Sequence, residues 1–222
     1  MSLILNIDTA LETASISLAK DGKAMNTVIN KEQKDHAAWL QVAIAGLLKS
    51  SGFELKDLSA IAVTIGPGSY TGLRVGLSSA KGLCYALNIP LITVSTLELM
   101  AHAAKNEEAG LLCPMIDARR MEVFAAVYTK SLKEVIKPHA RVLDSDSFSE
   151  LLNSNQILIF GSGSKKFSLL LNHDNAIFAE VHYDASNMAP ITMERFLSQQ
   201  FADLAYSEPA YLKDFFSPAR KP

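Results

Sequence analysis

Short apolar runs separated by turn residues dominate the first half of the chain. Residues 3–8 form an apolar run that ends at Asp8, which is typical of a buried strand. Two further strands are predicted at 14–20 and 23–30, because Asp21-Gly22 between alternating segments is a strong hairpin signal. Later elements are a helix at about 35–51, a strand at 60–65, a helix ending near 87, a strand at 90–94 and a helix at 96–102. The predicted order is therefore βββαβαβα.

The second half repeats this order in a shorter form. An apolar run at 111–117 again ends in an isoleucine and an aspartate, Ile116-Asp117. An alternating strand at 122–128, a helix at 145–152 and a strand at 157–160 are predicted after it. Gly161-Ser162-Gly163 then follows that strand, as Gly66-Pro67-Gly68 follows the strand at 60–65. Agreement in both the order and the type of element indicates a repeated unit.

A duplicated βββαβα unit is the plan of the actin-like α/β fold, the ribonuclease H-like fold of the superfamily of acetate kinase, sugar kinases and Hsp70. We therefore predict an amino-terminal lobe at 1–104, joined by the C-terminal segment 191–222. A smaller, reduced lobe is predicted at 105–190.

Composition narrows the class of protein. The chain has 222 residues, 49% of them hydrophobic, which suffices for one large domain or two small ones. Its formal charge of −2 provides no basic field, so tight autonomous binding to nucleic acid is not expected. Cys84 and Cys113 are the only cysteines, which excludes a disulfide scaffold and a CxxC site. Without a basic leader or an apolar run of membrane length, a soluble cytoplasmic protein is expected, with no membrane partner.

The most specific stretch is residues 66–76, with the sequence GPGSYTGLRVG. Glycines at a strand-to-helix turn allow close backbone approach, and the start of a helix offers free N–H groups to an anion. The run could therefore cradle a phosphate, contact a partner or serve close strand–helix packing alone. It is not a Walker P-loop, because no Gly-Lys-Ser/Thr follows. It is not a dinucleotide fingerprint either, because the next strand ends in Thr93-Val94-Ser95 without an acid.

This run resembles the defining motif of the TsaB (YeaZ) family. Further blocks that resemble the family are Ile7-Asp8-Thr9, His36, Val94-Ser95-Thr96-Leu97, Ile116-Asp117-Ala118-Arg119 with Glu122-Val123, and Pro209-Ala210-Tyr211-Leu212-Lys213. The chain departs from the family at Ser162, where an aspartate is common, and at Lys213, where an arginine is usual. The departure at Ser162 removes the acidic side chain that this loop often carries in the family.

The resemblance implies a subunit without catalytic activity of its own, an inactive paralogue. Members of the family pair with the paralogous catalytic subunit TsaD. With the ATPase TsaE, which joins through the complex, they support threonylcarbamoylation of the tRNA adenosine 3′ of the anticodon. The resemblance also implies that this subunit meets tRNA only indirectly and forms a homodimer when alone.

The sequence contains no convincing catalytic or metal-binding set. The catalytic paralogue carries a His-x-x-x-His pair, whereas here His36 is followed at that spacing by Leu40. The glycines around Ser69 are spaced wrongly for a Gly-x-Ser-x-Gly nucleophile elbow. We therefore expect no catalytic residue, no metal and no cofactor.

Nucleotide binding remains an alternative, because Asp8 and Asp117 stand where actin-like ATPases place acids. However, Ala10 and Ala118 occupy turns where a phosphate would need glycine. Asp8, Thr9 and Asp117 are therefore interpreted as vestigial cofactor-site residues whose acids hydrogen-bond their own turns. A small actin-like ATPase or kinase acting alone is the alternative function, and a homodimeric scaffold outside the tRNA pathway is a third.

The helix at 36–49 is apolar on more than one face, which predicts cover on two sides. Gly72, Gly76 and Ala80 recur every four residues and are expected to bring a neighbouring helix close. The two helices are accordingly predicted to form an intermolecular bundle. The candidate interface residues are His36, Trp39, Leu40, Ala43, Leu47, Tyr70, Gly72, Leu73, Gly76 and Ala80.

Overall fold

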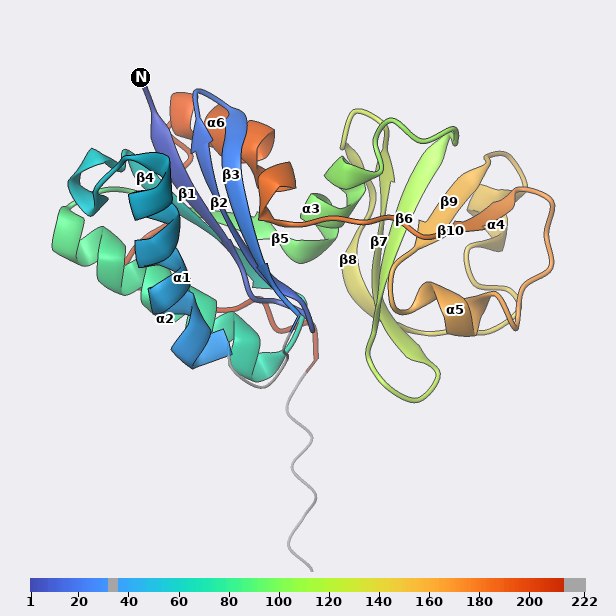
Figure 1. Cartoon of the computed structure of the whole chain (residues 1–222). Coiled ribbons are helices and arrows are strands. Elements are labelled where there is room, and N and C mark those ends of the chain that lie inside the picture. The colour runs from blue at the N-terminus through green and yellow to red at the C-terminus, as the bar shows by residue number, and fades with distance from the viewer. Residues whose placement is uncertain (32–35, 214–222) are drawn as a thin grey trace, which may run out of the picture.

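The computed structural model describes residues 1–31 and 36–213, and within them the strands form two five-stranded sheets (Figure 1). The first sheet comprises β1 (Leu3–Asp8), β2 (Ala14–Lys20), β3 (Lys23–Asn30), β4 (Ala60–Gly66) and β5 (Leu91–Ser95). The second comprises β6 (Leu111–Asp117), β7 (Glu122–Thr129), β8 (Glu134–Val142), β9 (Ile157–Phe160) and β10 (Ala176–Ala179).

The two sheets have the same topology. Their strand orders are β3-β2-β1-β4-β5 and β8-β7-β6-β9-β10. In each sheet the first three strands along the chain pair antiparallel, and the last two are added in parallel. This correspondence confirms the predicted duplication of an α/β unit.

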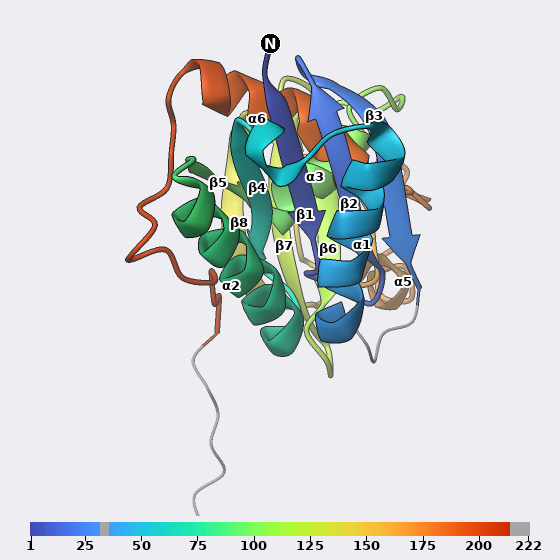
Figure 2. The same cartoon turned by 60° about the vertical axis from the view of Figure 1, so that its left-hand side comes forward.

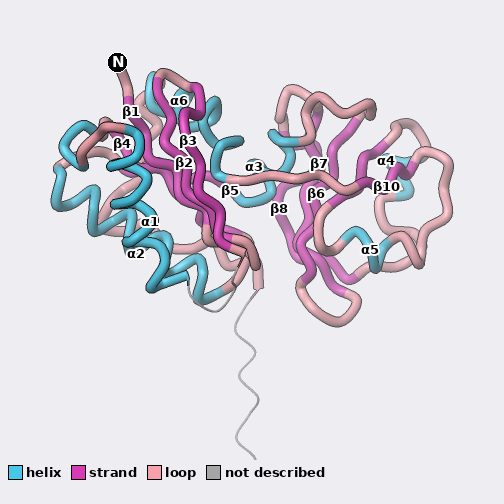
Figure 3. Tube along the Cα trace, in the orientation of Figure 1, coloured by secondary structure: helices cyan, strands magenta, loops and turns pink. Residues whose placement is uncertain are grey.

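Helices cover both faces of the first sheet. α1 (His36–Ser51) and α2 (Tyr70–Leu87) lie side by side on one face, and α6 (Met188–Leu197) lies on the other (Figures 1 and 2). α3 (Thr96–Ala103) packs between the sheets, with Leu99 against the first and Met100 against the second. The second sheet is covered by loops and two short helices, α4 (Ser149–Leu152) and α5 (Ser164–Phe167) (Figure 3). Among the described residues, no helix has the length and apolar character needed to cross a bilayer.

After β10 the chain returns to the first sheet. The short turn η2 (Ala185–Asn187) contacts β2, and α6 contacts β1 and β5. Ala202 then forms an antiparallel bridge with Leu91 of β5. The predicted lobe boundary at residue 190 falls inside α6, whose first turn already packs on the first sheet.

The structure differs from the predicted elements mainly in the second half. β8 and β10 are edge strands that the sequence pattern did not predict. The residues of β8 are exposed or half-buried and mix charged with apolar side chains, so they give no clear apolar alternation. β10 has only four residues, three of them half-buried. The helix predicted at 145–152 begins only at Ser149. The Ser147 hydroxyl donates to Asp144 Oδ1 at 2.7 Å, and Phe148 has a φ of 65°, so a local turn replaces the first helical turn. The predicted start of the first helix at Asp35 lies outside the described residues.

Candidate functional site

The glycine-rich run packs directly on the turn that follows β1. Ser69 N–H donates to the Ala10 carbonyl at 2.7 Å, and Thr9 Oγ1 donates to the Gly72 carbonyl at 2.7 Å. A Cβ on Gly68 would lie 2.3 Å from the Ala10 oxygen, and one on Gly72 would lie 2.1 Å from the Thr9 oxygen. These glycines are therefore needed for close backbone packing, the simplest of the three uses considered from the sequence. Ser69 N–H, a donor at the start of α2, is already used within the chain.

The row of small residues on α2 also faces inward. A Cβ on Gly76 would lie 2.3 Å from Thr9 Oγ1 and 3.3 Å from Val63 Cγ2. Gly72 and Ala80 are buried on the same side. The prediction that this row brings a neighbouring helix close is wrong, because its neighbour is the first sheet. Small residues are required here because α2 closely approaches the turn after β1 and the middle of β4.

The predicted interface residues as a whole differ in their exposure to solvent. His36, Leu40, Leu47, Gly72, Leu73, Gly76 and Ala80 are buried within the chain itself. Trp39 and Ala43 are half-buried and pack against the core of the first sheet, whereas Tyr70 is 39% exposed. Three of the predicted residues thus have surface available to a partner.

Asp8 and Asp117 occupy equivalent places in the two repeats and make equivalent hydrogen bonds. Asp8 Oδ1 accepts from Ala10 N–H at 3.1 Å, and Asp117 Oδ1 accepts from Arg119 N–H at 2.6 Å. Each acid therefore hydrogen-bonds the residue two positions on, which confirms the prediction that they cap their own turns.

The electrostatic environments of these two acids are opposite. Asp8 is only 2% exposed, and this burial raises the pKa of its carboxyl group despite a 2.7 Å hydrogen bond from Thr64 Oγ1. At Asp117, burial acts in the same upward direction, but hydrogen bonds from Lys166 and Arg119 outweigh it and lower the pKa. Lys166 Nζ donates to Asp117 Oδ1 at 2.7 Å and to the carbonyls of Arg120 and Glu122 at 2.7 and 3.0 Å. The second acid is thus neutralised by an ammonium group from the same chain.

Both acids line one cleft between the sheets, with a volume of about 1330 Å³. The start of α2, Ser162, and the segment around Tyr183 and Asp184 complete its walls. His36 also lines it, and its Nε2 lies 3.2 Å from the Leu11 carbonyl oxygen. Among residues 1–31 and 36–213, no three His, Cys, Asp or Glu side chains come together in a way that could hold a metal ion.

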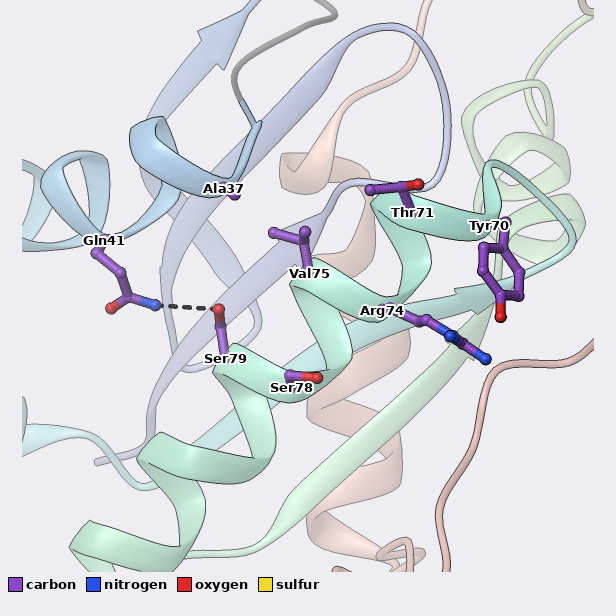
Figure 4. Close-up of a pocket in the computed structure, with 8 residues that line it drawn as sticks. All are labelled: Ala37, Gln41, Tyr70, Thr71, Arg74, Val75, Ser78 and Ser79. Carbon is purple, nitrogen blue, oxygen red and sulfur yellow. Dashed lines mark hydrogen bonds between the residues drawn. The ribbon is translucent and has the colours of Figure 1, made fainter.

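A second concave surface lies between α1 and α2. This shallow groove has a volume of about 550 Å³ and is shown in Figure 4. Its lining residues are Ala37, Gln41, Tyr70, Thr71, Arg74, Val75, Ser78 and Ser79. Gln41 Nε2 donates to Ser79 Oγ at 3.0 Å and ties the two helices together on their outer side.

The C-terminal block Pro209–Lys213 lies beside the glycine-rich run, although sequence reasoning did not place it there. Ala210 N–H donates to the Ile65 carbonyl at 2.7 Å. The rings of Tyr211 and Tyr70 are 5.5 Å apart, and Arg74 Nε donates to the Tyr211 hydroxyl at 3.0 Å. Lys213 pairs with Glu122 of the second sheet. In the sequence, the one feature that links Pro209–Lys213 to the glycine-rich run is that both resemble motifs of the same family.

The chain is similar to proteins of tRNA modification. It matches the family model TsaD, tRNA N6-adenosine threonylcarbamoyltransferase, over residues 25–213. It is 32% identical over 183 residues to the tRNA threonylcarbamoyladenosine biosynthesis protein TsaB of Bacillus subtilis, covering 82% of this chain and 75% of that protein. The TsaB protein of Escherichia coli is 30% identical over 228 residues, covering 95% of this chain and 94% of that protein.

Solved structures agree in fold. A Pseudomonas aeruginosa protein described as uncharacterized, with similarity to the peptidase YEAZ, superposes with a TM-score of 0.86 at 24% identity. That match covers 96% of this chain and 100% of the other. YeaZ from Pseudomonas aeruginosa gives a TM-score of 0.80 at 24% identity, with the same coverage.

Two sheets of identical topology around a central cleft, with a TsaD family match over most of the chain, define an actin-like α/β protein of the TsaD class. The extended similarity to the two TsaB proteins then narrows the assignment, and the chain belongs to the TsaB (YeaZ) family.

Proposed function

We propose that this chain takes part in tRNA threonylcarbamoyladenosine biosynthesis as a non-catalytic subunit. It pairs with a TsaD-type catalytic subunit in the cytoplasm and activates threonylcarbamoylation of the adenosine 3′ of the anticodon. A TsaE-type ATPase joins through the complex, and tRNA is met only through the partner. Membership of the TsaB family supports a role in this pathway. The main observation in favour of pairing with a catalytic subunit is the exposed outer face of α1 and α2.

The state of the cleft supports a non-catalytic role. An actin-like phosphotransferase needs acids free to hold a metal and a glycine-bearing turn open to a phosphate. Here Asp117 is paired with Lys166, and Asp8 accepts hydrogen bonds from Thr64 and Ala10. The space beside the glycines of the run at 66–76 is filled by the chain's own backbone and side-chain atoms. The absence of a bound metal or cofactor in the working protein remains a prediction.

The outer face of α1 and α2 supports pairing. Ala38, Val42 and Ala45 of α1 are exposed, as is Tyr85 of α2, and Trp39 and Ala43 border them. Val42 is 74% exposed and Tyr85 82% exposed, which is unusual for large apolar side chains on adjacent helices. Two helices from each subunit can form a four-helix contact, and the same face would serve a homodimer when the partner is absent.

Two experiments test this function. The chain is first co-purified with the TsaD-type subunit of the same organism, and the modified nucleoside is then assayed. We expect a stable complex and nucleoside formation only when both subunits and the ATPase are present. A chain that supports the assay without binding the catalytic subunit would contradict the proposed role.

A stand-alone actin-like ATPase is the second candidate, and the size of the cleft with two acids in its wall favours it. Calorimetry with ATP separates the two functions. We expect no tight binding by the chain alone. A low-micromolar dissociation constant, about 8 kcal/mol of binding free energy, would favour the ATPase.

A further inference from the structure

Arg74 is held in a fixed position on the outer surface of α2. Its guanidinium group lies over the Tyr70 ring, 3.8 Å from the ring centroid. Its Nε donates to the Tyr211 hydroxyl at 3.0 Å. Figure 4 shows the Arg74 side chain beside Tyr70 at one end of the groove, whereas Gln41 and Ser79 meet at the other end. Two tyrosines from distant parts of the chain therefore orient an exposed arginine before any partner arrives.

This orientation uses only part of the guanidinium. Within the described part of the chain, Arg74 makes no other hydrogen bond and no ion pair, so its two Nη groups have no acceptor there. Paired Nη groups held in one plane match the two oxygens of a carboxylate.

The two helices of this face carry basic residues but no acidic residue. The sequences of α1 and α2 contain no aspartate or glutamate, and Lys49, Arg74 and Lys81 are their only lysines and arginines. Lys81 Nζ already donates to the Ala205 and Ser207 carbonyls at 3.1 and 3.0 Å, and Lys49 lies in the last turn of α1. A single oriented arginine among apolar and hydroxyl side chains suits one acidic residue of a protein better than a polyanionic backbone, which needs several basic groups.

We propose that Arg74 is a specificity-determining residue of the α1–α2 face and receives a carboxylate of the partner subunit. Tyr211 is a positioning residue that aims the guanidinium. This proposal rests on the proposed function, because it requires the catalytic subunit to bind the outer face of α1 and α2. An exposed ion pair would contribute little, but one that the partner covers is removed from water and contributes more to binding.

The test measures the dissociation constant for the TsaD-type subunit by calorimetry at low and high salt. The variants are Arg74→Gln, Arg74→Lys and the control Arg120→Gln, which changes an exposed arginine of the second sheet's loop. We expect Arg74→Gln to weaken binding at least about tenfold and to reduce its salt dependence. Arg74→Lys should restore only part of the affinity, because a lysine cannot form the paired contact. Arg120→Gln should bind as the wild type does.

Tyr211→Phe tests the positioning role, because it removes only the oxygen that accepts from Arg74. We expect binding about threefold weaker in the wild-type background and no further change in Arg74→Gln, as coupled residues require. Arg74→Glu should regain affinity when an interface aspartate or glutamate of the catalytic subunit is changed to arginine.

The outcomes distinguish a failure of the carboxylate contact from a failure of the proposed function. If the wild type and Arg74→Gln bind the catalytic subunit equally, the carboxylate contact is wrong while the proposed function stands. If the wild type does not bind at all, the proposed function fails and takes this contact with it. If Arg74→Gln instead abolishes binding of purified tRNA to the chain alone, the ligand is a phosphate and the carboxylate assignment is overturned.

Discussion

A Cβ atom on Gly76 would lie 2.3 Å from Thr9 Oγ1, so α2 can meet the end of β1 only where this position has no side chain. The Thr9 hydroxyl is itself fixed by its hydrogen bond to the Gly72 carbonyl. The glycine-rich motif is thus a packing device that joins the first turn to α2. The opposite side of α2 remains exposed.

Gly76→Ala should destabilise the isolated chain by about 1–3 kcal/mol, because even one methyl group overfills this contact. Thermal unfolding measures the effect. Gly82 of the same helix is the matched control, since a Cβ there would meet nothing within 4 Å. Gly82→Ala should raise stability by about 1 kcal/mol through helix propensity. Equal melting temperatures for the two variants would contradict the inward orientation of Gly76.

Asp8→Asn should stabilise the chain at neutral pH. Burial raises the pKa of Asp8 in the folded state, so wild-type stability falls as the pH rises from the ordinary value of 3.8 through the higher native pKa. An asparagine keeps an oxygen that can accept from Ala10 N–H and Thr64, but it carries no charge to desolvate. Melting temperatures at several pH values should show a gain at pH 7 that shrinks toward pH 4. A uniform loss at all pH values would contradict this account of Asp8.

Lys166→Met should lower the stability of the chain at neutral pH, whereas Asp8→Asn should raise it. Lys166 and Arg119 hold the pKa of Asp117 below 3.8, so their contribution is present above that pH and is lost as the pH falls through the lower native pKa. Removing the ammonium group should destabilise the chain at pH 7 and have less effect once the pH falls below the native pKa of Asp117. Asp117→Asn should cause a smaller loss at pH 7, because Lys166 still donates to the Arg120 and Glu122 carbonyls.

The sequence was sufficient for the repeated architecture and much less informative about side-chain orientation. Ile7-Asp8 and Ile116-Asp117 lie at the ends of equivalent strands. The sequence predicts both ends, because a buried apolar run that stops at an acid is a local signal. The side of α2 that Gly76 faces depends instead on Thr9 and Val63, which are distant in sequence. The contact between Arg74 and Tyr211 joins residues separated by 137 positions, and no local pattern reports it. β8 was missed because an exposed edge strand lacks the apolar alternation that marks a buried one.

The central claim is that the outer face of α1 and α2 binds a TsaD-type catalytic subunit. Val42 on α1 is 74% exposed and Val142 at the end of β8 is 66% exposed, so the two form a matched pair of surface valines. Aspartate at either position should leave the melting temperature of the isolated chain nearly unchanged, because neither side chain is in the core.

The most direct measurement is the dissociation constant for that subunit with the wild type, Val42→Asp and Val142→Asp, determined by calorimetry. The account predicts that Val42→Asp weakens binding at least about tenfold, because an unpaired charge would be buried in an apolar contact, while Val142→Asp binds as the wild type does. Unchanged affinity in well-folded Val42→Asp protein would contradict the claim.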